Sequence, residues 1–128
     1  MLLSFDRRYQ SFTKWRKLVG LRSLLHWYGI RLCRTVLGYE PAMWRVHPRL
    51  AEHRLQLRLG GSSDFDVFNQ IFMQEDYASL RDLTGVSVIV DLGANAGFSS
   101  AYLLTCFPGS RILSVEPDHR NVAVCRAN

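Results

Sequence analysis

From Ser4 to about Leu37 the apolar positions recur every three or four residues, a pattern typical of amphipathic helix. Two successive apolar series carry this pattern: Phe5, Tyr9, Phe12, Trp15 and Val19, followed by Leu21, Leu24, Leu25, Tyr28, Leu32 and Val36. Because glycine weakens a helix, we expect Gly20, Gly29 and Gly38 to interrupt or end these helical segments.

The pattern changes after the helical stretch. Residues 39–53 contain Pro41 and Pro48 and are expected to be irregular. Residues 54–59 then alternate strictly between polar and apolar side chains, which predicts a half-buried strand ended by a pair of glycines. One side of the following helix carries Phe65, Phe68, Ile71 and Phe72, after an N-cap supplied by Ser62, Ser63 or Asp64.

The last third of the chain alternates between strand and helix. Residues 86–90 are dominated by β-branched side chains and barely alternate, which predicts a strand buried on both faces of a parallel sheet. A helix through residues 99–104 follows, then a second strand over residues 111–115. Asp118 is expected to cap a last helix that runs to residue 128. Strand, crossover helix and strand form a βαβ unit, so the sequence predicts an α/β fold.

Composition fits one ordinary globular domain of 128 residues, with 48% hydrophobic and 21% charged side chains, and excludes a disordered or collagen-like chain. The charge is uneven. Residues 1–58 hold twelve Lys or Arg against three acidic residues, whereas residues 59–128 hold four Arg against eight. The basic, helical arm could touch anionic lipid, nucleic acid or an acidic partner. We favour the simpler alternative, in which its arginines solvate the outer face of two covering helices.

The aromatic and histidine side chains of the first half are expected to be structural. Trp15, Trp27 and Trp44 are interpreted as packing anchors rather than platforms for base stacking. His47 and His53 are six positions apart, which suits neither one helical face nor a common metal pair. We therefore expect no metal site.

Cysteine usage and the N-terminal residues bear on the compartment. Cys33, Cys106 and Cys125 are widely spaced and form no C-x-x-C pair, which favours free thiols in a reducing environment. The first ten residues contain no apolar core of a secretory signal. The uncharged residues 92–110 are broken by glycines and a proline, which argues against a transmembrane helix. The expectation is a soluble cytoplasmic protein without a transmembrane segment.

The most informative segment is VIVDLGANAGFS, residues 88–99, where a predicted strand ends and a helix begins. Ligands bind at such places in open α/β sheets. Gly93 allows a sharp turn that brings backbone N–H groups close to a ligand. Asn95 is one of the few residues other than glycine that tolerate a positive φ. Gly97 is expected to permit close approach of the helix to the strand.

Two acidic residues flank this loop. Dinucleotide-binding loops place a pyrophosphate on the helix N-terminus and usually have no acid at the strand end. Asp91 stands at that end, where it would repel a pyrophosphate and attract the cationic amino-acid end of S-adenosylmethionine. Glu116 ends the next strand, where a carboxylate can accept both ribose hydroxyls of an adenosine. The pair favours S-adenosylmethionine over NAD, although Asp91 as a helix cap and Glu116 as a solvated strand end remain the alternative.

These residues resemble a known family. The segments VDLGANAGFSS and SVEPD are similar to the D-x-G-A-N-x-G-x-x-S loop and following E-P of FkbM-type S-adenosylmethionine-dependent methyltransferases. Residues 57–68, LRLGGSSDFDVF, also resemble that family's opening strand and S-D helix, and Tyr77 fits the same pattern. The resemblance covers roughly residues 54–128.

The resemblance implies a Rossmann-like class I methyltransferase fold and O-methylation of a hydroxyl, often on a sugar or another natural product. It implies a small-molecule or glycan acceptor and gives no indication of nucleic acid. By the same resemblance the methionine-side loop consists of Asp91, Gly93, Ala94, Asn95 and Gly97, and Glu116 holds the ribose.

The chain departs from the family pattern in its extent. Such enzymes have a seven-stranded sheet, whereas this sequence stops after two core strands, so the parallel sheet is expected to be incomplete and open at one edge. No general base is identified, and His119 beside Glu116 is expected to be a surface residue. We therefore hypothesise an N-terminal methyltransferase fragment over residues 54–128, preceded by a basic helical arm over residues 1–53. The alternatives are a non-catalytic module that uses its basic arm, or an NAD-binding half-domain.

Overall fold

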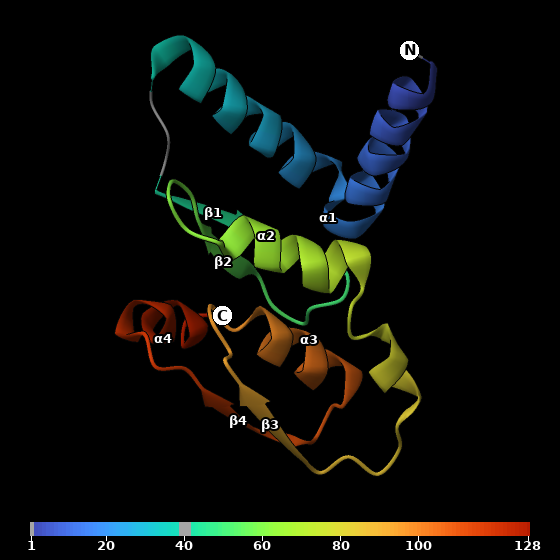
Figure 1. The fold of residues 1–128 in the computed structure, drawn as a ribbon, viewed down its shortest axis with the longest axis vertical. Coiled ribbons are helices and arrows are strands. Elements are labelled where there is room, and N and C mark those ends of the chain that lie inside the picture. Colours follow the sequence, from blue (N-terminus) through green and yellow to red (C-terminus); the bar gives the residue numbers. More distant parts are fainter. Residues whose placement is uncertain (1, 39–41) are drawn as a thin grey trace.

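The computed structural model describes residues 2–38 and 42–128, with side chains from residue 12 onward. Within this part of the chain the fold is mixed α/β, with four α-helices and two small two-stranded sheets. One sheet is antiparallel and the other parallel. Figure 1 shows the long N-terminal helix along one side of the molecule and the parallel sheet on the opposite side.

The predicted N-terminal helical stretch is confirmed as α1 (Leu2–Leu37). A sharp kink at Gly20, with φ 77° and ψ 161°, divides α1 into the two arms of a V (Figure 1). Gly38, with φ 65°, follows the last helical residue. The expected interruption at Gly29 is wrong, because this glycine lies within continuous helix beside the buried Ile30. A glycine inside a helix costs only about 1 kcal/mol, which packing of neighbouring side chains offsets.

The prediction of irregular structure over residues 39–53 is wrong for one segment. Strand β1 (Met43–Val46) pairs antiparallel with β2 (Leu55–Arg58), the strand that the alternating pattern predicted. Along the sequence Pro41 and Pro48 flank β1, so neither proline removes a hydrogen bond from the ladder. Pro41 itself lies outside the described residues. This pairing joins the predicted N-terminal arm, residues 1–53, to the strand that begins the predicted domain over residues 54–128.

The predicted amphipathic helix begins at Asp64 and has two parts. Helix α2 (Asp64–Phe68) continues into a π-helical turn, η1 (Asn69–Gln74), and a short 3₁₀ helix, η2 (Ala78–Asp82), follows. Ser63 occupies the N-cap position, but its side chain makes no capping hydrogen bond. Three of the four predicted core positions, Phe68, Ile71 and Phe72, are buried, and Phe65 is partly buried.

The predicted βαβ unit is confirmed. Strand β3 (Val88–Leu92), helix α3 (Phe98–Cys106) and strand β4 (Arg111–Val115) follow one another, and β3 and β4 are parallel. Helix α4 (His119–Cys125) then starts at the expected cap, where the Asp118 carboxylate accepts a hydrogen bond from the Arg120 backbone N–H at 2.8 Å. The helix ends at Cys125, three residues before the expected end at residue 128.

The expectation that the first strand of this unit is buried on both faces is wrong. Helix α3 covers one face of the sheet, the face of Ile89 and Asp91. The opposite face carries five apolar side chains that are 45–76% exposed: Val88, Val90, Leu92, Leu113 and Val115. In the described part of the chain no helix lies over that face, and β3 has no partner on its second edge.

Aromatic side chains connect the layers of the core. Trp15 and Trp27 each stack on Phe65, with ring centroids 5.5 and 4.9 Å apart, and Trp27 also lies 4.9 Å from Trp44 of β1. Phe68 contacts Phe98 of α3 at 5.8 Å. The three tryptophans are therefore packing anchors, as predicted. Through these contacts α1 packs directly against β1 and α2.

The cysteine and histidine side chains of the described residues lie as the sequence predicts. Cys33, Cys106 and Cys125 are free cysteines, and His47 and His53 are exposed. The same residues contain no cluster of histidine, cysteine and acidic side chains able to hold a metal ion. None of the described helices has the length and apolar character needed to cross a membrane.

Candidate functional site

The candidate site lies where β3 and β4 end. Because the strands are parallel, with Leu92 opposite Val115, their carboxyl ends meet at the same edge of the sheet. Asp91 stands near the end of β3, and Glu116 directly follows β4. A hydrogen bond of 2.8 Å from the Asn95 backbone N–H to Oε2 of Glu116 joins the loop after β3 to the end of β4. The structure thus brings the predicted loop and both acids together.

The loop has the backbone that its sequence predicts. Gly93, Asn95 and Gly97 have φ values of 81°, 48° and 81°, so Asn95 adopts the expected left-handed conformation. The N–H groups of Gly93 and Ala94 both donate to the carbonyl oxygen of Val115, at 2.8 and 3.1 Å. The end of β4 therefore occupies these two N–H groups.

Gly97 makes its close approach to a different element from the one expected. A Cβ atom built on Gly97 would lie 2.9 Å from Sγ and 3.0 Å from Cα of Cys125. The close contact is therefore with the end of α4 rather than with strand β3. The start of α3 and the end of α4 pack directly against each other at this glycine.

Asp91 is held by hydroxyl groups from the start of α3. Its Oδ2 accepts hydrogen bonds from Oγ of Ser99 at 2.7 Å and of Ser100 at 2.6 Å. The Ser100 and Ser114 hydroxyls lie 2.7 Å apart, which extends the network to β4. Asp91 is 9% exposed, and its Oδ1 accepts no hydrogen bond from the described residues. Asp91 does not cap α3, because the N-cap residue is Gly97.

Glu116 is not simply a solvated strand end. Its Oε1 accepts hydrogen bonds from the Asp118 backbone N–H at 3.0 Å and from Nδ2 of Asn121 at 3.2 Å. Together with the bond from Asn95, these donors lower the pKa of Glu116, the Asp118 N–H being the largest cause. Hydrogen bonds to the charged form favour ionisation, so Glu116 is a carboxylate at neutral pH.

A side-chain network that the sequence did not reveal leads away from Glu116. Oδ1 of Asn121 accepts a hydrogen bond of 2.7 Å from Nη2 of Arg58 on β2. Arg58 in turn binds the buried carboxylate of Asp64 through both Nε and Nη2. Arg58 and Asn121 are 63 residues apart, so spacing could not show their contact.

Two other groups near the loop have altered acid strength. The hydrogen bonds from Arg120, side chain first and then backbone, lower the pKa of Asp118 to about 2. Burial raises the pKa of the Cys125 thiol, and the negative charge of Asp91 raises it further. Cys125 is therefore a thiol rather than a thiolate at neutral pH, and a weak nucleophile.

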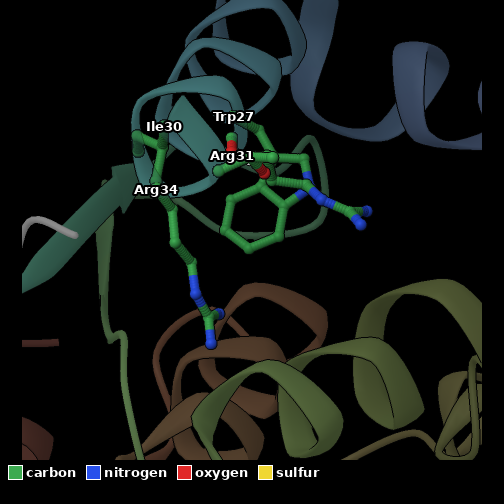
Figure 2. A pocket seen from close by; sticks show the side chains of 5 residues that line it. Trp27, Ile30, Arg31 and Arg34 are labelled. Carbon is green, nitrogen blue, oxygen red and sulfur yellow. Dashed lines mark hydrogen bonds between the residues drawn. The ribbon is translucent and has the colours of Figure 1, made fainter. Parts of the chain in front are cut away.

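One open hollow follows β3, and another lies between the β2–α2 segment and the start of α4. A mostly apolar groove of about 370 Å³ follows the unpaired edge of β3 and includes Asp91 among its lining residues. A polar hollow of about 400 Å³ is lined by Arg58, Asp118 and Asn121. A further cavity of about 390 Å³ contains no loop residue, and Figure 2 shows its lining side chains on α1: Trp27, Ile30, Arg31, Arg34 and Thr35.

Comparison with known proteins gave no relative: no family model matches the chain, and neither the curated proteins nor the solved structures contain a significant match. The interpretation of the loop therefore depends on its own residues and their geometry.

Proposed function

We propose that the chain is an S-adenosylmethionine-dependent methyltransferase of the FkbM type, with a Rossmann-like class I arrangement around β3 and β4. The observation that carries the proposal is the position of two carboxylates, Asp91 and Glu116, at the same sheet edge around a glycine loop. The acceptor that we propose is a hydroxyl of a sugar or another small natural product.

The acceptor atoms beside the loop suit the amino-acid end of the cofactor. Oδ1 of Asp91 accepts no hydrogen bond from the described residues, and neither does the buried Oδ1 of Asn95. The Oδ1 atom of Asp91 is the one of the two that is not fully buried, so a ligand donor can reach it, and a hydrogen bond to a charged group contributes about 1.5–3 kcal/mol. The α-ammonium group of S-adenosylmethionine has three donors and a positive charge that complements Asp91.

Glu116 is suited to bind the ribose of S-adenosylmethionine. Its Oε1 already accepts two hydrogen bonds, whereas Oε2 accepts one, from Asn95. One position on Oε2 thus remains for a ribose hydroxyl. A second hydroxyl would have to take the place of Asn121, whose bond to Oε1 is the longest of the three, at 3.2 Å.

The same geometry favours this cofactor over a dinucleotide. A pyrophosphate needs backbone N–H groups at the helix N-terminus. In the loop that leads to this terminus, the N–H groups of Gly93, Ala94 and Asn95 already donate to Val115 and Glu116 and are not open to a phosphate. Two carboxylates beside the loop would also repel phosphate charge. When bound, S-adenosylmethionine supplies an electrophilic methyl group, and the part of these residues is to bind and orient the cofactor.

Calorimetric titration of the 128-residue chain with S-adenosylmethionine, S-adenosylhomocysteine and NAD tests the proposal. We expect binding of both adenosyl sulfur compounds and no binding of NAD. Binding of NAD alone would favour the half-domain alternative, and no binding of any of the three would contradict a cofactor role for the loop. Transfer of a labelled methyl group to a hydroxyl acceptor would then test the reaction itself.

A further inference from the structure

The second arm of α1, residues 21–37, is apolar on two sides. One side faces the protein, where Leu24 and Ile30 are buried and Trp27 packs on Trp44 and Phe65. The other side carries an outward stripe of five residues that are 49–68% exposed: Leu21, Leu25, Tyr28, Leu32 and Val36. A helix that only covered a core would not need this second apolar side.

The outward stripe forms one continuous face. Its members follow one another at intervals of four, three, four and four residues, which places them on the same side of a helix. From Leu21 to Val36 the stripe extends for about 22 Å at the helical rise per residue. In Figure 1 this arm lies at the periphery of the molecule, with β1 and α2 on its inner side. Contiguous exposed apolar surface of this kind marks an interaction site.

The charge around the stripe is positive. Residues 12–37 contain no acidic residue and six exposed basic ones: Lys14, Arg16, Lys17, Arg22, Arg31 and Arg34. Arg22 flanks the stripe directly, whereas Arg31 and Arg34 lie on the side of the α1 cavity, away from the stripe (Figure 2). The long stems of such side chains allow their charged ends to reach a nearby anionic surface.

We propose that the outward face of residues 21–37 docks α1 onto an anionic lipid surface. The stripe enters the boundary between headgroups and acyl chains, Arg22 lies at the lipid phosphates, and the positive charge of the rest of α1 attracts the anionic surface at longer range. The opposite side of the helix is buried against the protein, so this arm lies along the surface rather than entering the bilayer.

The aliphatic composition of the outward stripe favours lipid over nucleic acid as the binding partner of this face. Proteins that bind single-stranded nucleic acid combine basic grooves with exposed aromatic rings on which bases stack. Four of the five stripe residues are aliphatic and have no counterpart on a phosphate backbone, whereas acyl chains accommodate them. Tyr28 is the exception, and tyrosine is common at the headgroup level of membranes.

Flotation of the full chain with vesicles tests the docking surface. Vesicles of phosphatidylcholine mixed with phosphatidylglycerol should bind the chain at least about tenfold more strongly than phosphatidylcholine alone, and high salt should weaken that binding. The double variant Leu25→Gln/Leu32→Gln should lose about tenfold or more in affinity for the mixed vesicles. Leu83→Gln, at a position 54% exposed outside α1, is the matched control and should bind like the wild type.

The proposal is overturned if the wild type and the double variant bind the mixed vesicles alike, or if both vesicle types bind the chain equally. It is also overturned if an RNA homopolymer displaces the chain from vesicles and the two leucine substitutions do not change the affinity for that RNA. Circular dichroism checks that the variants are folded. The variant Leu21→Gln/Val36→Gln, at the ends of the stripe, repeats the test and should also weaken binding. Asp91→Asn should leave vesicle binding unchanged, which separates this surface from the cofactor proposal.

Discussion

Arg58 and Asp64 form a two-point ion pair, with Nε of Arg58 3.0 Å from Oδ2 and Nη2 2.7 Å from Oδ1 of Asp64. The Asp64 carboxylate is completely buried and also accepts the Arg58 backbone N–H at 2.7 Å. The hydrogen bonds to Asp64 raise the pKa of Arg58. Because Arg58 also donates to Asn121, which donates to Glu116, the pair connects the β2–α2 segment to the candidate cofactor loop.

Removing the arginine from this pair should be strongly destabilising. Arg58→Ala leaves the buried Asp64 carboxylate without its cation, and losing one partner of a buried pair costs about 3–5 kcal/mol. Arg58 is itself 23% exposed, so we expect a value near the lower end, about 3 kcal/mol. Urea unfolding measures the loss. Arg54→Ala, at an exposed position just before β2, is the control, and an equal effect of both changes would contradict a structural role for the pair.

Gly97 and Gly93 offer a matched test of the loop packing, because both have φ 81°. Gly93→Ala meets no atom within 4 Å, so it should cost only the backbone strain, about 1–2 kcal/mol. Gly97→Ala adds a clash with Cys125 and should cost about 1–3 kcal/mol more. Thermal or urea unfolding of the two variants gives the comparison. Equal destabilisation would mean that α4 does not pack against Gly97 in solution.

Acid should weaken the fold partly through Asp118 and Glu116. Both groups have lower pKa values in the folded chain, so their contribution is complete above the unfolded pKa and is lost as the pH falls through the folded value. For Asp118 this window runs from its usual 3.8 down to about 2. The free energy of unfolding should therefore fall over this range, and the fall should be smaller in Asp118→Asn. An identical pH profile for the variant would contradict the assignment.

The open edge and bare face of the parallel sheet should promote self-association. Unpaired strand edges are sites of edge-to-edge pairing, and Val90 is 56% exposed beside the unpaired edge of β3. Val90→Lys should reduce association in sedimentation velocity runs at increasing protein concentration, and change stability by no more than about 0.5 kcal/mol. If the sedimentation coefficient of Val90→Lys rises with protein concentration as much as that of the wild type, the chains associate through another surface.

Local pattern was enough to predict most of the elements. The three-to-four spacing predicted α1, strict alternation predicted β2, and the β-branched run predicted β3. The positive φ of Asn95 also followed from residue chemistry alone. Strand β1 was missed because four residues near two prolines carry little pattern, and the strand forms through its pairing with β2.

Features that depend on distant partners could not be predicted. The exposure of Val88 and Leu92 depends on what covers the sheet, which a β-branched run does not show. The N–H groups of the loop pair with Val115, and Arg58 reaches Asn121, because the fold brings separate segments together. The placement of Asp91 and Glu116 was predictable because both stand at the carboxyl ends of parallel strands, which share one edge of the sheet.

The most direct test of the cofactor proposal is calorimetric binding of S-adenosylmethionine to wild type, Asp91→Asn and Asp66→Asn. Asparagine at position 91 preserves the size of the side chain and can still accept from Ser99 and Ser100, but it lacks the negative charge. Asp66 is an exposed acid on α2, so its variant controls for net charge. We predict that Asp91→Asn weakens binding by about tenfold or more, as expected for a charged hydrogen bond, and that Asp66→Asn binds like the wild type. Equal affinity of all three proteins, or no binding by the wild type, would contradict the central claim.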